Sequence, residues 1–186
     1  GLIGFSCMTN TFIGFKKIAV ELKSLGIPIV VGGIHPTVRP DECLDYADYV
    51  CVGEGEKPLL ELVDKLEKKK PTEKIKNLYM KKNGKVIRND LGPIIKDLDT
   101  LPVPTFNLKN TYYYNNGKIN CLHEHKELLV KEYGNYYFII ASRGCPYRCK
   151  YCLNDCLIQI NPEVARIRQR SKEHIIKELK NIKKIF

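Results

Sequence analysis

The sequence predicts an α/β protein, a parallel sheet with helices packed on both of its faces. Continuous apolar stretches, typical of strands buried on both faces, end in loops that contain glycine or small polar residues. Each stretch is followed by residues with apolar positions at helical spacing. The strands are expected at residues 1–5, 27–31 and 49–52, and the loops that end them at Ser6–Thr9, Gly32–His35 and Gly53–Gly55.

Helices are expected between and after these strands. Residues 12–25 place apolar side chains at helical spacing, and Gly26 is a natural C-terminal stop. Residues 40–46 favour a short helix, and residues 59–66 are amphipathic. In sheets of this kind, ligands bind outside the carboxyl ends of the strands, near the point where the strand order reverses. Glycines in the loops at that edge would let a ligand approach the backbone closely.

The character of the chain changes after residue 70. Asn83-Gly84, between two short stretches with strand-like residues, predicts a β-hairpin, and a second Asn-Gly within residues 111–120 makes another plausible. Leu101-Pro-Val-Pro104 predicts an extended linker, because proline blocks helix formation in itself and in the residue before it.

A new strand–loop–helix unit begins near residue 135. A strand is expected at 136–141, a cysteine-rich loop follows it, and after an irregular stretch Ser171 begins an amphipathic helix. This order is that of the opening unit of a parallel β/α barrel. Because the chain starts inside a predicted strand and stops inside a predicted helix, we expect it to be part of a longer protein. Three parts are predicted: an α/β domain at 1–70, a linker with hairpins at 71–134, and the start of a barrel domain at 135–186.

The composition is typical of a soluble globular protein. Of the 186 residues 44% are hydrophobic, and no apolar run approaches the length of roughly 20 residues that spans a bilayer. Much of the net charge of +10 lies in residues 163–186, which contain eight Lys or Arg and three Glu. A nucleic-acid surface is one interpretation, but we favour a solvated helix face. Four of the eight cysteines lie within twelve residues and no apolar leader opens the chain, which favours a reducing cytoplasm and metal-bound thiolates.

The most informative motif is the run formed by Cys145, Cys149 and Cys152, with the spacing C-x3-C-x2-C. Zinc sites commonly use two cysteine pairs separated by a dozen or more residues, and this stretch has no second pair. A compact run fits an iron–sulfur cluster better, and its spacing differs from that of the two-cluster ferredoxins. Three ligands would leave one iron of a four-iron cluster free to chelate a small molecule. Cys156 is interpreted as an ordinary thiol.

The segment from Ser142 to Cys152 resembles the signature loop of the radical S-adenosylmethionine enzymes, C-x3-C-x-aromatic-C. The resemblance implies that Cys145, Cys149 and Cys152 hold a [4Fe-4S] cluster whose open iron binds the amino and carboxylate groups of S-adenosylmethionine. It places Tyr151 beside the adenine. It also implies reductive cleavage of S-adenosylmethionine to a 5′-deoxyadenosyl radical, which abstracts hydrogen from a substrate.

The N-terminal half resembles the cobalamin-binding domain, of flavodoxin- or Rossmann-like fold, that precedes this loop in one large subclass. Matching pieces follow the three predicted strands in the same order, and residues 95–104 resemble the linker of that subclass. The resemblance implies that the cobalamin tail lies at the switch point, and that it is lined by Ser6, Thr9, Gly32, Gly33 and Gly53. His35 is interpreted as a loop-packing residue more readily than as a cofactor contact.

Other polar side chains give weaker indications. His123 and His125 stand in a stretch rich in Glu and Lys and are interpreted as solvated. Glu54 and Glu56 could bind ribose hydroxyls, but an acidic residue at a helix N-terminus is an equally good explanation. No catalytic side chain is assigned.

The resemblance implies methyl transfer to an unactivated carbon or phosphorus centre. Two alternatives remain open: a radical oxidative cyclase of the magnesium-protoporphyrin ester cyclase type, and a non-catalytic module that binds cobalamin or zinc. The expected partners are a small-molecule substrate and an external electron donor such as flavodoxin or ferredoxin, with no membrane span and no nucleic acid. The substrate is not readable from these residues.

Overall fold

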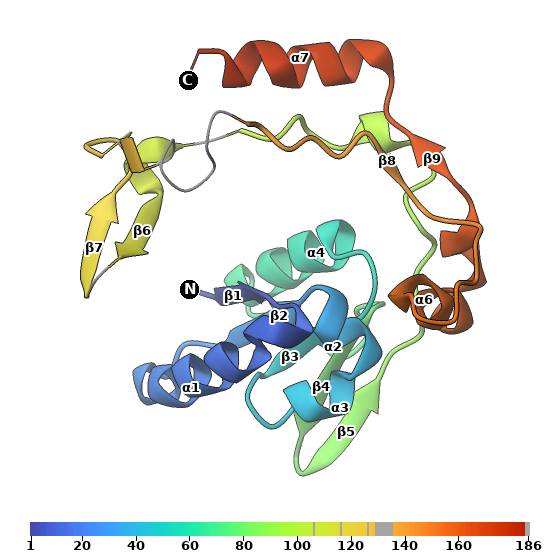
Figure 1. The fold of residues 1–186 in the computed structure, drawn as a ribbon. Helices are drawn as coiled ribbons and strands as arrows, with labels where there is room; N and C mark the ends of the chain where they lie inside the picture. Colours follow the sequence, from blue (N-terminus) through green and yellow to red (C-terminus); the bar gives the residue numbers. More distant parts are fainter. Residues whose placement is uncertain (106, 116, 126, 129–135, 185–186) are drawn as a thin grey trace. The chain divides into compact units, whose positions relative to one another are not determined.

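The computed structural model describes residues 1–105, 107–115, 117–125, 127–128 and 136–184. These residues form two compact units, which are drawn as ribbons in Figure 1. Unit 1 consists of Gly1–Ile95 and Cys145–Ala165, and unit 2 of Lys96–Gly144 and Arg166–Phe186. The predicted α/β domain and the cysteine loop therefore belong to one unit.

Unit 1 is built on a five-stranded sheet with the order β1-β2-β3-β4-β5. The first three strands are parallel neighbours, which confirms the three strands expected from the sequence. The last two are antiparallel, so the sheet is mixed. The strands are β1 (Ile3–Ser6), β2 (Ile29–Gly32), β3 (Tyr49–Cys51), β4 (Leu78–Lys82) and β5 (Lys85–Arg88).

The hairpin predicted at Asn83-Gly84 is confirmed. Both residues have positive φ, 50° and 74°, as a type I′ turn requires. Strand β4 pairs with β3 through the register Val50 to Tyr79, so the hairpin extends the sheet instead of standing in a separate connector. The sheet thus runs past residue 70, where the sequence had placed the end of the α/β domain.

The helices of the N-terminal half differ from the expected ones mainly at their ends. The helix expected at 12–25 is α1 (Phe12–Leu22) continued by a 3-10 turn, and it stops at Gly26 with φ 62°, as predicted. Helix α4 (Glu56–Glu67) begins three residues earlier than expected. Helix α3 (Pro40–Cys43) is shorter than predicted, and α2 (Ile34–Val38), directly after the Gly-Gly pair, was not predicted.

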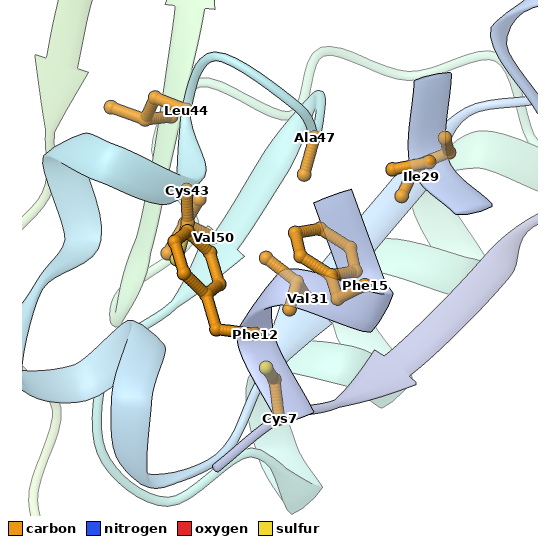
Figure 2. Close-up of a cluster of buried hydrophobic side chains, with 10 residues drawn as sticks. Cys7, Phe12, Phe15, Ile29, Val31, Cys43, Leu44, Ala47 and Val50 are labelled. Carbon is orange, nitrogen blue, oxygen red and sulfur yellow. The ribbon is translucent and has the colours of Figure 1, made fainter. Parts of the chain in front are cut away.

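Two apolar clusters cover the two faces of the sheet. The first joins α1 and α3 to one face and is drawn in Figure 2, where the rings of Phe12 and Phe15 reach toward Val31. The second joins α4 to the opposite face, with the buried side chain of Leu62 against Leu78 and other strand residues. The predicted arrangement of helices on both faces of a sheet is therefore confirmed, as the ribbon in Figure 1 also shows.

Unit 2 contains short strand pairs and one long helix. The second predicted hairpin is present as β6 (Tyr112–Asn115) and β7 (Lys118–Cys121). Strand β8 (Ser142–Arg143) pairs antiparallel with β9 (Arg168–Gln169). Helix α7 (Lys172–Ile182) begins at Ser171, whose side chain accepts a hydrogen bond from the His174 N–H, so the predicted helix start is confirmed. Residues 129–135 and Phe186, which fall in predicted parts of the chain, lie outside the described residues.

Two predictions for the C-terminal part are wrong. Residues 136–141 are extended but are not a strand, and only β8 pairs, because none of the described strands runs alongside the preceding stretch. An apolar run favours a strand only where a neighbour takes up its backbone hydrogen bonds. The stretch after Cys152, expected to be irregular, contains α6 (Leu153–Ile160) and a 3-10 turn at Pro162–Ala165.

A buried polar cluster holds α7 in unit 2. The Glu178 carboxylate is buried, forms an ion pair with Arg170 and accepts a hydrogen bond from the Tyr137 hydroxyl. Arg170 Nε donates to His174 Nδ1 at 2.9 Å, and His174 Nε2 lies 3.0 Å from the Leu101 carbonyl oxygen. The cluster therefore connects α7 to two extended segments that are distant in sequence.

Tyr137 is predicted to make the stability of unit 2 fall at alkaline pH. Burial, followed by its hydrogen bond to the negatively charged Glu178, raises the pKa of the Tyr137 hydroxyl from 10.0 to about 12. Because the pKa of Tyr137 is higher in the folded protein than in the unfolded chain, this hydroxyl stabilises the fold fully below pH about 10. Its contribution to the free energy of unfolding is lost as the pH rises from about 10 to about 12. We expect Tyr137→Phe to flatten the stability of the protein across that window, as measured by urea denaturation at a series of pH values. An unchanged profile in the variant would contradict this.

No helix in the described part of the chain is both long and apolar enough to cross a membrane.

Candidate functional site

The predicted cobalamin-binding residues lie at one edge of the sheet. Ser6 is the last residue of β1, Gly32 the last of β2, and Gly53 follows β3 by two positions. Because these three strands are parallel neighbours, their carboxyl ends meet at the same edge. Ser6, Thr9, Gly33 and Gly53 are exposed there.

Strands β1, β2 and β3 stand in sequence order in the described sheet, so the order does not reverse between them. The helices that connect them contribute to the same apolar cluster, as consecutive crossovers in one direction do. The loops after these adjacent strands form the candidate site, and its place at a topological switch point stays a prediction.

Gly33 is the point of closest approach between two of these loops. Its φ is 104°, and a Cβ at this position would stand 2.8 Å from the Cys7 carbonyl oxygen and 2.9 Å from the Cys7 nitrogen. The Cys7 N–H donates to the Gly32 carbonyl at 2.8 Å, and the His35 N–H donates to the Cys7 carbonyl at 3.1 Å. The loops after β1 and β2 are thus joined through their backbones, which only glycine at position 33 allows.

Thr37 joins the third loop to the second, and sequence reasoning missed it. Its buried hydroxyl donates to the Gly33 carbonyl at 2.8 Å and accepts from the Gly53 N–H at 3.0 Å. One sequence feature could have indicated this role. Thr37 stands one helical turn after the Gly-Gly pair, where a hydroxyl can donate a hydrogen bond to the carbonyl four residues earlier.

Replacing Thr37 by valine is expected to destabilise the protein by about 1–3 kcal/mol, because its buried hydroxyl makes two hydrogen bonds, to the Gly33 carbonyl and from the Gly53 N–H, each with a net contribution of about 0.5–1.5 kcal/mol. The shape of the side chain changes little. Thr37→Ser keeps the hydroxyl and is the matched control, with an expected loss of about 1 kcal/mol from the missing methyl group. Urea denaturation compares the two, and a valine variant as stable as the serine variant would show that the hydroxyl does not join the loops.

Asn77 fixes the backbone before Gly53 in a similar way. Its φ is 65°, its amide nitrogen donates to the Val52 carbonyl at 2.6 Å, and its amide oxygen accepts from the Gly92 N–H at 2.7 Å. Asparagine tolerates this left-handed conformation better than most residues. No local sequence pattern indicates this role, because residue 77 is distant from both of its partners along the chain.

The other polar residues singled out from the sequence have structural partners. The His35 ring lies 4.0 Å from the Phe12 ring and is buried, which supports its interpretation as a packing residue. Glu54 accepts a hydrogen bond from the Ile95 N–H at 2.8 Å, and Glu56 stands in the first turn of α4. His125 is paired with Glu127 at 3.1 Å at the surface.

Of the cysteines outside the loop, Cys7, Cys43 and Cys51 are buried and Cys121 is partly accessible. Burial, with smaller effects from Cys7 and Glu42, raises the pKa of Cys43 to about 12. Burial, with a smaller effect from Glu56, raises the pKa of Cys51 to about 11. A thiol that stays protonated is a poor metal ligand, because thiolates are the species that bind metals. These two cysteines therefore do not compete with the loop for a metal.

The cysteine loop carries three half-buried thiols within eight residues, and two of them, Cys149 and Cys152, stand at the ends of one turn. The Cys152 N–H donates to the Cys149 carbonyl at 2.9 Å, and Cys152 then serves as the N-cap residue of α6. The Cys145 N–H donates to the Val164 carbonyl at 3.4 Å, so the start of the loop is held by the segment after α6. Cys145, Cys149 and Cys152 are each partly accessible, whereas Cys156 is exposed.

The side chains around these thiols are mostly open to solvent. Tyr151 is 93% exposed, and the Arg148 guanidinium lies 3.8 Å from the Asp155 carboxylate. Among the described residues, no three His, Cys, Asp or Glu side chains are gathered closely enough to hold one metal ion. The chemistry of the donor set, three thiols within one eight-residue loop, fits an iron–sulfur cluster, in which each thiolate binds a different iron.

The loop and the glycine edge are connected within unit 1. Helix α6, which begins at Cys152, lies in contact with α2, which begins after Gly33. The two segments are more than a hundred residues apart in the sequence, and both belong to the same compact unit.

Comparison with known proteins shows which proteins this chain resembles. Residues 1–63 match the family model of the B12 binding domain. An uncharacterized methyltransferase of Pyrococcus horikoshii is 29% identical over 184 residues, which is 96% of this chain and 36% of that protein. The anaerobic magnesium-protoporphyrin IX monomethyl ester cyclase of Synechocystis is 29% identical over 158 residues, 81% of this chain and 28% of that protein.

A solved structure confirms the fold. The radical S-adenosylmethionine methyltransferase TsrM from Kitasatospora setae, solved with cobalamin and a [4Fe-4S] cluster bound, matches 97% of this chain and 35% of its own with a TM-score of 0.66 and 19% identity. The resemblance to the cobalamin-binding radical S-adenosylmethionine proteins is thereby confirmed, with an α/β cobalamin-binding fold. The chain spans about a third of the length of these proteins.

Proposed function

We propose that this chain is part of a cobalamin-dependent radical S-adenosylmethionine enzyme. The observation that carries the proposal is that one compact unit contains both the match to the B12 binding domain, with its glycine-containing carboxyl edge, and a loop with three partly accessible cysteines at the spacing C-x3-C-x2-C. A cobalamin-binding module alone has no need of three cysteines at this spacing. The pairing of the two features therefore favours an enzyme with two reactive cofactors.

Cobalamin would be held at the edge by Ser6, Thr9, Gly32, Gly33 and Gly53. The two hydroxyls would exchange hydrogen bonds with polar groups of the cofactor. Gly53 has a φ of 84° and, like Gly33, presents exposed backbone without a side chain, which lets a bulky ligand approach closely. The links through Thr37 and Cys7 would keep the three loops at a fixed spacing when the cofactor is absent.

Cys145, Cys149 and Cys152 would hold a [4Fe-4S] cluster, with S-adenosylmethionine at the fourth iron and Tyr151 beside its adenine. A reduced cluster of this type supplies the electron that cleaves a carbon–sulfur bond of S-adenosylmethionine. The turn closed between Cys149 and Cys152 would orient two of the thiolates, and their partial burial would limit access of water to the sulfurs. An external donor such as flavodoxin or ferredoxin would supply the electron.

Methyl transfer to an unactivated carbon or phosphorus centre is the reaction we favour, because the relative that covers most of this chain is named as a methyltransferase. Oxidative ring closure is the second candidate, because an anaerobic cyclase is equally similar over 81% of the chain. Both reactions require the same two cofactors and a small-molecule substrate.

Anaerobic incubation of the full-length protein with S-adenosylmethionine and a low-potential reductant tests the proposal. We expect reductant-dependent formation of 5′-deoxyadenosine, methylated product or both. A control without reductant should give neither. A non-catalytic cobalamin or zinc module would bind its ligand and leave S-adenosylmethionine intact in both samples, and that result would exclude an enzyme of this class.

A further inference from the structure

His35 is a buried imidazole whose two nitrogens face different groups. Nδ1 lies 3.2 Å from the Thr9 hydroxyl oxygen, within hydrogen-bond distance. Nε2 has no hydrogen-bond partner among the described residues and lies 3.8 Å from the Glu42 carboxylate. The ring is only 5% exposed and is stacked against Phe12. Packing against Phe12 accounts for the ring but leaves the two polar contacts unexplained.

The charges around His35 determine which nitrogen carries the proton. Glu42, on α3, attracts the proton to Nε2, the nitrogen nearest to it. Helix α1, which packs against His35 through Phe12, also carries a charged residue. The Lys16 Nζ atom lies 5.2 Å from the centre of the Phe12 ring. The nearby Cys7 thiol has other hydrogen-bond partners, the Met8 carbonyl oxygen and the Thr11 hydroxyl. With the proton on Nε2, Nδ1 is an acceptor, so the Thr9 hydroxyl donates to it.

This arrangement fixes the direction of the Thr9 hydroxyl at the edge of the sheet. Thr9 is exposed in the loop that carries Ser6, and its contact with His35 joins it to the segment after Gly33. Once its hydrogen points to His35, its oxygen can only accept hydrogen bonds from a ligand. A hydroxyl without such a partner would rotate and serve as donor or acceptor.

We propose that His35 is a positioning residue that holds Thr9 as a hydrogen-bond acceptor for a donor group of the bound cofactor. This inference rests on the proposed cobalamin site. The donor is an amide N–H₂ of the corrin side chains or a hydroxyl of the nucleotide tail, the two kinds of donor that cobalamin carries.

Equilibrium binding of hydroxocobalamin to the full-length protein tests the link. Thr9→Val is expected to weaken binding about tenfold, the loss of one hydrogen bond. His35→Phe keeps an aromatic ring against Phe12 and is expected to weaken binding by a similar or smaller factor. The double variant should bind as weakly as Thr9→Val alone, because the histidine acts only through the threonine. Independent, multiplying losses would overturn the inference.

One further variant tests the role of Glu42, the carboxylate that lies 3.8 Å from His35 Nε2. Glu42→Gln removes the charge at an exposed position and should weaken cobalamin binding by no more than His35→Phe does. A larger loss from Glu42→Gln than from His35→Phe would overturn the inference.

Binding of a second ligand, cobinamide, shows which part of cobalamin carries the hydrogen-bond donor. Cobinamide keeps the corrin amides and lacks the nucleotide tail. If Thr9→Val weakens binding of cobalamin and cobinamide alike, the donor is a corrin amide; if it weakens cobalamin binding alone, the donor is on the tail. An effect on neither ligand contradicts the inference while the cobalamin site itself stands. A wild-type protein that binds neither ligand would overturn the proposed site as well.

Discussion

Replacing Cys149 by alanine is expected to abolish iron binding by the full-length protein. The wild type, reconstituted anaerobically with iron and sulfide, should carry about four irons per chain and be brown, as [4Fe-4S] proteins are. The variant should lose most of this iron, because two remaining thiols from one short loop do not hold a cubane. Formation of 5′-deoxyadenosine should fall to background with it. Iron and sulfide analysis together with visible absorption measure the effect.

Cys156→Ala is the matched control for this experiment. Cys156 is four residues after Cys152 on α6 and is exposed, so it belongs to the same segment without belonging to the signature motif. Its removal should leave iron content and S-adenosylmethionine cleavage unchanged. Equal losses from both variants would mean that Cys156 is a ligand and that the open coordination position does not exist. Iron retained by Cys149→Ala would contradict the assignment of the three cysteines.

Substitution of Gly33 by alanine is expected to be the most damaging change in the N-terminal half. The added Cβ would stand within 3 Å of two Cys7 backbone atoms, which hold the loop after β1 and cannot turn aside as a flexible side chain could. The positive φ of 104° adds its own strain for any residue with a Cβ. We expect a loss of stability of about 3–5 kcal/mol and a loss of cobalamin affinity of more than about tenfold.

Gly26→Ala separates the two causes. Gly26 also has positive φ, 62°, but a Cβ there would meet no atom within 4 Å. This control should cost only the backbone strain of about 1–2 kcal/mol and leave cobalamin binding intact, because Gly26 ends α1 and lies away from the carboxyl ends of the strands. Denaturant melts and cobalamin titrations of both variants make the comparison. If the two variants behaved alike, the close contact between the loops would have no role in the site.

The sheet could be predicted because its signals are local. Apolar stretches bounded by glycine gave β1, β2 and β3, and Asn83-Gly84 gave the turn between β4 and β5. The pairing of that hairpin with β3 was not predictable, since register depends on residues distant in sequence. The strand expected at 136–141 shows the same limit, because an apolar run says nothing of whether a neighbouring strand exists.

The candidate site was predictable where residue type decides its chemistry. Three cysteines at fixed spacing and glycines after strands are visible in any reading of the sequence. Thr37, Asn77 and the pairing of His35 with Thr9 were not visible, since each acts through a contact between loops. Such contacts become evident only when the strands are placed side by side.

The most direct test of the whole account is the metal content of the full-length protein after anaerobic reconstitution with iron, sulfide and hydroxocobalamin. The account predicts about four irons and one cobalt per chain, a brown protein, and little zinc. A colourless protein that holds one zinc per chain, with no cobalt retained, would contradict it.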